Sequence, residues 1–268
     1  MFSFNLLKRT LSEQKISLAI YTIGLGLYAW MMVAMFPSTT KGVDLDQYWE
    51  SFPEAMKQFF GGQELSLATL EGFISIEYIL VWQFIIIAFA IAFATRSIVK
   101  EIEDGTLELM LSYPISRFKF IFTKIATGVI ATFLLTAISS LVLYLTTFTI
   151  DYSIALSKII YVGIANFGLF FAFLGISFLF STIFSERGKA NFTIVGILIA
   201  SYLINAFANM SDKIEKFDFL SLFKYVKNET ILANNSVNWS NFLILVGVGV
   251  VCSIIAIIIF QKRDIQGK

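Results

Sequence analysis

Long apolar blocks without charge restrict most strongly what this chain can fold into. Five stretches carry almost no charged residue: 78–95, 125–150, 159–184, 192–209 and 242–260. A helix of about 20 such residues crosses the roughly 30 Å of hydrocarbon in a bilayer. The chain is 57% hydrophobic and 15% charged, whereas soluble domains are about 45–50% apolar and about 25% charged. These stretches predict an integral membrane protein.

The hydropathy pattern predicts an all-α membrane protein with one transmembrane domain over residues 1–268. The six expected spans are 16–36, 73–95, 119–150, 158–184, 190–209 and 241–260. Pro37 is expected to end the first span, and the third is longer than a bilayer needs, so it must tilt, kink or project into water. Between the spans lie two expected outer loops, 37–72 and 210–240, and one long loop on the opposite side, 96–118.

Basic residues are distributed unevenly between the two sides that six spans define. The segments 1–15, 96–124, 185–190 and 261–268 hold 13 of the 20 Lys and Arg residues, including all five Arg, but 7 of the 19 acidic residues. The rest of the chain holds 7 basic and 12 acidic residues. Because Lys and Arg are enriched on the cytoplasmic side, the pattern predicts a multi-pass protein of the cell membrane with both termini in the cytoplasm.

The residues before the first span have an amphipathic pattern. Phe4, Leu7 and Leu11 recur at the spacing of one helix face, and the other face is polar and basic. This pattern predicts a short amphipathic helix within the first 15 residues that lies in the cytoplasmic membrane interface ahead of the span. The alternative is a simple basic flank of the span.

The chain lacks the residue types on which most enzymes and metal sites depend. It has no His and a single Cys, Cys252, so the commonest proton shuttle, the commonest metal ligand and an internal disulfide are all missing. The nearest approach to a phosphate-binding G-x-x-x-x-G-K-[ST] loop, 185–190, lacks the first glycine and the final hydroxyl. We therefore expect no catalytic residue, metal site or bound cofactor here, and the net charge of +1 gives no indication of nucleic-acid binding.

The loop between the second and third spans carries the most informative local pattern. Asp104-Gly105 predicts a turn. After it, Thr106 is suited to cap a short helix, and Glu108 lies in the first turn, where the helix dipole favours a negative charge. Residues 107–111 are then mostly apolar. The segment therefore predicts a short, capped helix with an apolar face, parallel to the membrane.

The same loop contains its own stop and restart signals. Pro114 ends the short helix, because the residue before a proline avoids the helical region. Ser116 can then cap the next helix, which begins at Arg117. From the residues alone, two functions of the short helix stay open: it transmits a push from a cytosolic partner to the flanking spans, or it only anchors the loop.

Three segments carry a resemblance to a known family. Residues 103–108, Glu-Asp-Gly-Thr-Leu-Glu, and 112–117, Ser-Tyr-Pro-Ile-Ser-Arg, resemble the first cytoplasmic loop of ABC-2 type permeases, the membrane subunits of a class of ATP-binding cassette (ABC) transporters. Residues 260–265, Phe-Gln-Lys-Arg-Asp-Ile, resemble the ending of that family. Residues 220–225 resemble its segment before the last span, although the proline expected near 221–222 is missing.

The resemblance implies the permease subunit of an ATP-driven exporter, which forms half of a dimeric translocation path. It implies that 106–112 is a coupling helix that docks into a separate ATPase and that the N-terminal amphipathic helix is the elbow or connecting helix. ATP and Mg²⁺ would bind that partner, which explains the missing phosphate loop. The implied partners are two ABC ATPase subunits, a second permease chain and the lipid bilayer. The implied coupling residues are Glu103, Gly105, Thr106, Leu107, Glu108, Leu109, Leu111, Ser112, Pro114 and Arg117.

Four polar residues inside the spans are candidates for the substrate path: Glu77, Gln83, Asn166 and Asn205. An unpaired amide in hydrocarbon is costly, so each must find a partner or line a path. The alternative for the two Asn is hydrogen bonding between helices, and for Glu77 it is an interfacial position.

Two functions other than transport are weighed against the exporter. An intramembrane enzyme is disfavoured, because the spans contain no His and no acidic pair at helical spacing. A non-transport membrane scaffold or immunity protein could keep the permease fold, but it would have no need of a capped helix that is ready for an ATPase.

Overall fold

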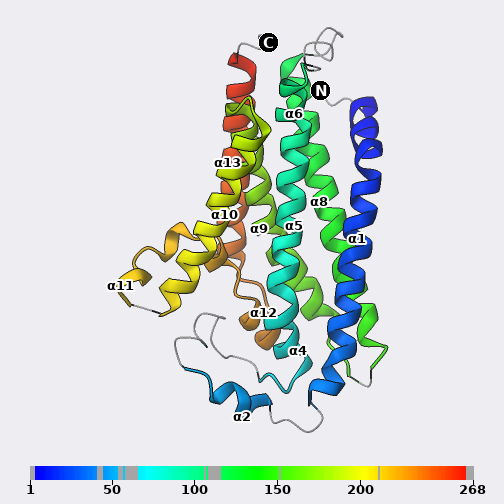
Figure 1. The fold of residues 1–268 in the computed structure, drawn as a ribbon, viewed down its shortest axis with the longest axis vertical. Helices are drawn as coiled ribbons and strands as arrows, with labels where there is room; N and C mark the ends of the chain where they lie inside the picture. The colour runs from blue at the N-terminus through cyan, green and yellow to red at the C-terminus, as the bar shows by residue number, and fades with distance from the viewer. Residues whose placement is uncertain are drawn as a thin grey trace.

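The structure, a computed structural model, is a bundle of helices. It describes residues 4–40, 45–53, 57, 66–105, 107, 116–150, 152–210 and 212–263, and it has no strand within these ranges. Figure 1 shows the long helices running side by side along the long axis of the molecule, with short helices gathered towards one end.

Six helical segments of the described chain are long and apolar enough to cross a membrane, which confirms the predicted six-span architecture. Five are single α-helices: α1 (Phe4–Thr40), α8 (Arg117–Thr147), α9 (Leu156–Ile183), α10 (Arg187–Met210) and α13 (Trp239–Lys262). The sixth is built from consecutive pieces: α4 (Leu70–Phe73), the π-helical η1 (Ile74–Tyr78), α5 (Ile79–Ser97) and α6 (Val99–Glu103).

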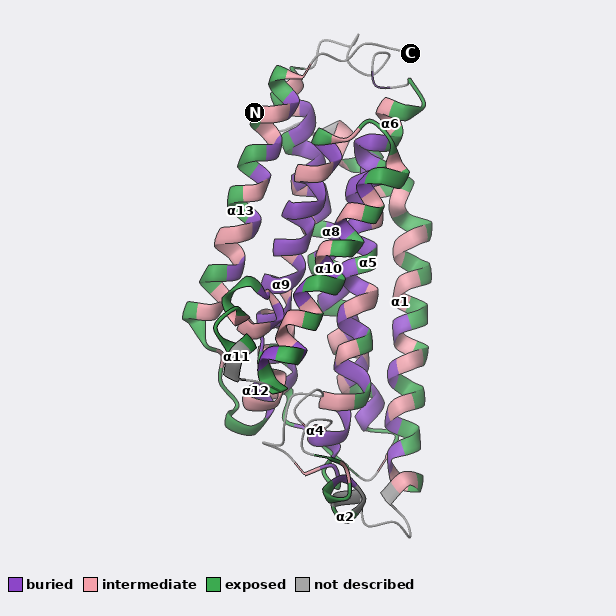
Figure 2. Cartoon of the chain, turned by 60° about the vertical axis from the view of Figure 1, so that its left-hand side comes forward, coloured by how far each residue is buried: buried purple, intermediate pink, exposed green. Residues whose placement is uncertain are grey.

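The centre of the bundle is formed by α5 and α9. Helix α9 packs against α13, α5 and α8, and α1 lies on the outside against α8. Figure 2 shows the buried residues concentrated on these central helices. The most apolar 18-residue window of each span shows how far it is buried. The buried share of this window is 67% in Leu70–Glu103 and 61% in Leu156–Ile183, but only 17% in Leu6–Thr39 and 28% in Arg187–Met210. Most of the apolar surface of α1 and α10 is therefore left for lipid or for another chain.

A glycine contact brings α9 and α13 close together. A Cβ atom added to Gly175 on α9 would lie 2.9 Å from the Cα of Gly249 on α13, and one added to Gly249 would lie 2.8 Å from the carbonyl oxygen of Phe171. Small residues at a membrane helix crossing allow the two backbones to approach each other. The α9–α13 pair is thus fixed by backbone contact.

Helix α1 differs from the prediction at both ends. It runs without a break from Phe4 to Thr40, so residues 4–15 are helical but do not form a helix separate from the span. The Arg9–Glu13 ion pair, 2.9 Å at i,i+4 spacing, supports this helical extension.

The prediction that Pro37 ends the first helix is wrong, because the helix contains Pro37 and ends three residues later. A proline removes only one donor of the backbone ladder. Here the hydroxyl groups of Ser38 and Thr39 donate to the carbonyl oxygens of Met35 (2.7 Å) and Phe36 (2.8 Å) and hold the last turn.

The two ends of the bundle carry different elements. The N-terminal end of α1 and the C-terminal end of α13 lie at the same end of the bundle as α6, here called the α6 end (Figure 1). The opposite end, here called the α12 end, collects most of the short elements: α2 (Leu45–Glu50), α11 (Asp212–Glu215), the 3₁₀ helices η2 (Asp218–Leu220) and η3 (Phe223–Tyr225), and α12 (Asn228–Asn234).

Candidate functional site

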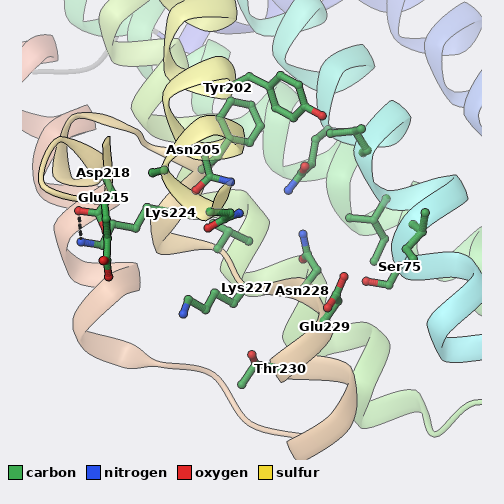
Figure 3. A pocket seen from close by; sticks show the side chains of 18 residues that line it. Ser75, Tyr202, Asn205, Glu215, Asp218, Lys224, Lys227, Asn228, Glu229 and Thr230 are labelled. Atoms are coloured by element: carbon green, nitrogen blue, oxygen red, sulfur yellow. Dashed lines mark hydrogen bonds and ion pairs between the residues drawn. The ribbon is translucent and has the colours of Figure 1, made fainter. Parts of the chain in front are cut away.

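A cavity of about 490 Å³ lies towards the α12 end, between η1 and α5, α10, and residues 215–230. Its lining includes Gln83 and Asn205, two of the four residues predicted for a substrate path. In Figure 3, Asn205 on α10 and Asn228 on α12 lie on different sides of this cavity. A volume of this size is typical of a site for a small molecule or for part of a larger one.

A chain of hydrogen-bonded amides runs along one side of the cavity. Gln83 Nε2 donates to Asn166 Oδ1 (2.6 Å), and Asn166 Nδ2 donates to Asn228 Oδ1 (2.6 Å) and to the carbonyl oxygen of Val162 (2.9 Å). Asn166 is completely buried. Its amide therefore joins α5, α9 and α12, as expected for hydrogen bonding between helices, and the two residues at the ends of this chain of amides reach the cavity.

The amides on α10 are in a different state. Asn205 and Asn209 both line the cavity, and neither side chain has a hydrogen-bond partner among the described residues. An amide on a membrane-spanning helix needs a partner. In this position water or a ligand in the cavity can supply it, so α10 presents unsatisfied polar groups to the cavity.

Glu77 is not brought together with the other three predicted path residues. Its side chain is exposed, and it is not among the residues that line the cavity. Its backbone carbonyl oxygen, in the π-helical η1, accepts a hydrogen bond from the Tyr28 hydroxyl (2.6 Å). A π-helical turn shifts the backbone ladder, and Tyr28, stacked on Tyr78, ties α1 to this shifted turn.

The residues between 215 and 230 add charge to the cavity, a role that the sequence does not predict for them. Lys224 Nζ pairs with Asp218 (2.6 Å), and the lining also includes Glu215, Lys227 and Glu229. The available signal was the density of charged residues in the expected outer loop, but nothing in the sequence indicated that this loop folds back against α5 and α10.

Residues 220–225, which carried part of the resemblance, hold this segment against α10. Ser221 Oγ donates to the Ser201 carbonyl oxygen (2.6 Å), and the Leu222 backbone N–H donates to Ser201 Oγ (2.9 Å). A proline at position 222 would lack that N–H. The hydrogen bond to Ser201 therefore requires a residue other than proline at position 222.

At the α6 end, the structure describes residues 96–105, 107 and 116–118 of the loop 96–118. Thr106 and 108–115 lie outside the described residues, so the predicted short helix, with Glu108, Leu109, Leu111, Ser112 and Pro114, stays a prediction. The Asp104-Gly105 turn is confirmed: the Gly105 N–H donates to the Ile102 carbonyl oxygen (3.2 Å), and Gly105 has a φ of +69°. Leu107 is 1% exposed and belongs to the apolar core of this chain.

The second half of the loop and the C-terminal motif contact each other. Ser116 caps α8 as predicted, accepting a hydrogen bond from the Lys119 N–H (3.3 Å). The Arg117 guanidinium donates to the carbonyl oxygen of Arg263 (2.6 Å), and the rings of Phe120 and Phe260 stack at 5.8 Å. Two motifs that lie far apart in the sequence therefore form one assembly.

Arg263 extends this assembly to the end of α9. Its guanidinium donates to the carbonyl oxygens of Thr182 (2.7 Å) and Phe184 (3.1 Å) and to Ser185 Oγ (2.5 Å). Burial lowers the pKa of the Arg263 guanidinium, but arginine stays protonated in proteins. The ends of α8, α9 and α13 are thus joined by one charged side chain and its neighbours.

Two acidic residues of α6 reach other helices. Glu101 Oε1 lies 3.7 Å from Nζ of Lys124 on α8, and Glu103 Oε2 accepts a hydrogen bond from the backbone N–H of Arg187, the first residue of α10 (3.0 Å). The loop is therefore bound to two spans as well as to the C-terminal motif. Within the described residues, no group of three His, Cys, Asp or Glu side chains could hold a metal ion.

The fold and these two sites define the class: a polytopic helical membrane protein with a polar cavity towards one end and a loop fixed to the helix ends at the other. The family described as ABC-2 family transporter protein matches residues 17–265. The chain belongs to this family and is a membrane component, with a permease role, of an ABC transporter. None of the curated proteins matches the chain.

Proposed function

We propose that this chain is the permease subunit of an ATP-driven exporter and forms half of a dimeric translocation path. A separate ABC ATPase, which binds ATP and Mg²⁺, drives it through the loop 101–117. The assembly at the α6 end carries the proposal: the loop is fixed to α8 and α10 by Glu101 and Glu103 and to the C-terminal motif by Arg117. A force applied to this loop therefore reaches several spans.

The charge distribution supports the orientation. The described parts of the segments that hold 13 of the 20 Lys and Arg residues lie at the α6 end, and such segments stay in the cytoplasm. With the α6 end in the cytoplasm of a cell-membrane protein, the loop faces the ATPase and the cavity lies towards the outside. The cavity is then the exit part of the path, lined by Gln83 and Asn205, with Asn166 behind it.

The surface of α10 supports the dimer. Only 28% of its apolar window is buried, and the same helix presents Asn205 and Asn209 to the cavity. A second permease chain, identical or a paralogue, would cover part of this surface and complete the wall of the path. Such a chain pair would take two ATPase subunits.

The coupling assignment is tested by co-purification with the ATPase encoded beside this chain. Leu109→Asp, in the predicted coupling helix, should abolish the complex or its stimulated ATP hydrolysis, because a buried carboxylate in an apolar dock is costly. Leu107 is unsuitable for this test, because its side chain lies in the core of the chain itself.

The matched control is Leu220→Asp, the same change at an exposed leucine of η2, on the segment that lines the cavity. It should leave assembly and hydrolysis as in the wild type. If Leu109→Asp also assembles and hydrolyses ATP normally, the coupling assignment is wrong. If the wild-type chain binds no ATPase at all, the scaffold alternative is favoured.

A further inference from the structure

The N-terminus of α10 receives a side-chain acceptor from another part of the chain. The first turn of α10 contains no acidic residue, and Glu186, which directly precedes it, pairs with Lys189 (2.8 Å). The first backbone N–H groups of a helix lack partners within the helix, and this end carries a partial positive charge. The carboxylate of Glu103 meets both needs, because Oε2 accepts from the Arg187 N–H at 3.0 Å across 84 residues of sequence.

Glu103 also occupies the point at which the loop turns. It is the last residue of α6 and is followed by the Asp104-Gly105 turn, which leads into 106–112. Its side chain is exposed. Only the Asp104-Gly105 turn separates Glu103 from residue 106, so a displacement of 106–112 pulls on the backbone of Glu103.

The other side of α6 is fixed to a different span. Glu101 lies 3.7 Å from the Lys124 ammonium, and Lys124, which is 2% exposed, also lies 5.5 Å from the centre of the Phe120 ring. This buried ammonium anchors α6 to α8. Helix α6 is thus held between α8, through Glu101, and α10, through Glu103.

Helix α10 connects this contact to the cavity without an interruption. It is one α-helix from Arg187 to Met210. At a rise of about 1.5 Å per residue, Arg187 and Asn205 are about 27 Å apart along its axis. Figure 1 shows α10 running from the neighbourhood of α6 towards the α12 end. Because α10 packs only lightly against α9, α5 and α6, it can shift as a rigid rod with few packing contacts to break.

We propose that Glu103 is a positioning residue that links the 106–112 segment to α10, so that displacement of this segment by the ATPase moves the α10 wall of the cavity. This inference rests on the proposed function. The family resemblance implies that Glu103 contacts the ATPase. In the structure, however, its carboxylate accepts a hydrogen bond from α10 of its own chain.

The first test measures the link in the full chain in lipid nanodiscs, without ATPase. Glu103→Ala should speed hydrogen exchange of the amides at the start of α10 by about fivefold, the usual effect of a lost capping acceptor. Asp104→Ala is the matched control, because Asp104 is the neighbouring carboxylate, is exposed and has no side-chain partner among the described residues. Equal exchange in Glu103→Ala and the wild type would overturn the link.

The second test asks whether the link transmits movement. A reporter cysteine replaces Asn209, which lines the cavity, in a Cys252→Ser background, and the complex with its ATPase is labelled with a membrane-impermeant maleimide. The reporter chain should show one labelling rate without nucleotide and another with ATP and vanadate. Glu103→Ala should strongly reduce this difference, because the contact between α6 and α10 is lost, while the complex still forms.

Two further variants distinguish a role of Glu103 in positioning α10 from a role in protein stability alone. Glu103→Gln keeps an acceptor oxygen and should restore most of the nucleotide-dependent difference, and Asp104→Ala should keep all of it. A full difference in Glu103→Ala overturns the inference, and so does loss of the ATPase complex, which would assign Glu103 to the dock. If the reporter chain itself shows no response to nucleotide, the proposed function fails instead.

Discussion

Helices α9 and α10 follow each other in the chain and have similar lengths, yet they differ in how tightly they pack in the bundle. In its most apolar window α9 is 61% buried, and its backbone touches α13 at Gly175 and Gly249. Helix α10 is 28% buried, and its N-terminus is capped from α6 by Glu103. Helix α9 is thus buried within the bundle, whereas α10 packs against the bundle along one face only.

The amides on the two helices differ in the same way. The Asn166 amide on α9 has three hydrogen bonds and no exposed surface. The Asn205 amide on α10 faces the cavity and has no partner among the described residues. An asparagine in a membrane helix is therefore no evidence of a substrate path by itself. An asparagine whose hydrogen bonds are satisfied by the protein, such as Asn166, bridges helices. One without a protein partner, such as Asn205, is available to line a path.

The largest expected effect concerns the backbone contact of α9. Gly175→Leu would place a side chain where the Cα of Gly249 lies 2.9 Å from the first added atom. Overpacking of this kind costs about 3 kcal/mol or more when backbone must move, so we expect a large loss of folded protein and a lower thermal midpoint in nanodiscs.

Gly196→Leu is the matched change on α10, because a Cβ atom there meets nothing within 4 Å. It should leave the thermal midpoint unchanged in the monomeric chain. If both variants lose the same stability, the distinction between a scaffold helix and a loosely packed helix is wrong.

Local signals in the sequence were sufficient for the elements of the fold. Six spans follow from length and apolarity, since a segment in lipid must satisfy its own backbone. The cap at Ser116 and the turn at Asp104-Gly105 depend on neighbouring residues only, and both are confirmed. Pro37 was misjudged because two hydroxyl groups that follow it stabilise the turn that the proline weakens.

The sites depend on partners that are distant in the sequence, which local patterns do not contain. Nothing near Glu103 indicates that its carboxylate caps a helix 84 residues later. Nothing near Asn166 indicates Gln83 and Asn228 as its partners. Gln83, Asn166 and Asn205 stand out in the sequence because they are polar in apolar spans, but only their positions in the bundle separate the hydrogen-bonded bridge from the cavity wall.

A second, smaller effect compares the two asparagines directly. Asn166→Leu removes the bridge and leaves the Gln83 and Asn228 amides without their shared partner. Loss of the partner of a buried amide such as Gln83, which is 4% exposed, costs about 2 kcal/mol, so this variant should unfold at lower denaturant concentration than the wild type.

Asn205→Leu should behave in the opposite way. It removes an amide that has no protein partner among the described residues, so the unfolding midpoint should stay the same or rise, while transport by the complete complex falls. A loss of stability in Asn205→Leu equal to that in Asn166→Leu would mean that both residues are structural.

The smallest effect concerns two buried serines. Ser177 on α9 donates to the Phe173 carbonyl oxygen of its own helix (2.6 Å), whereas Ser201 on α10 accepts from the Leu222 N–H of the segment that covers the cavity (2.9 Å). Ser177→Ala should change stability very little, because its carbonyl partner keeps the backbone bond of the helix. Ser201→Ala should cost about 1 kcal/mol, since the Leu222 N–H loses its acceptor, and it should raise hydrogen exchange in residues 220–225 without affecting α9. If exchange in that segment does not change, the segment is held by its aromatic contacts, and the attachment of α10 at this end does not depend on Ser201.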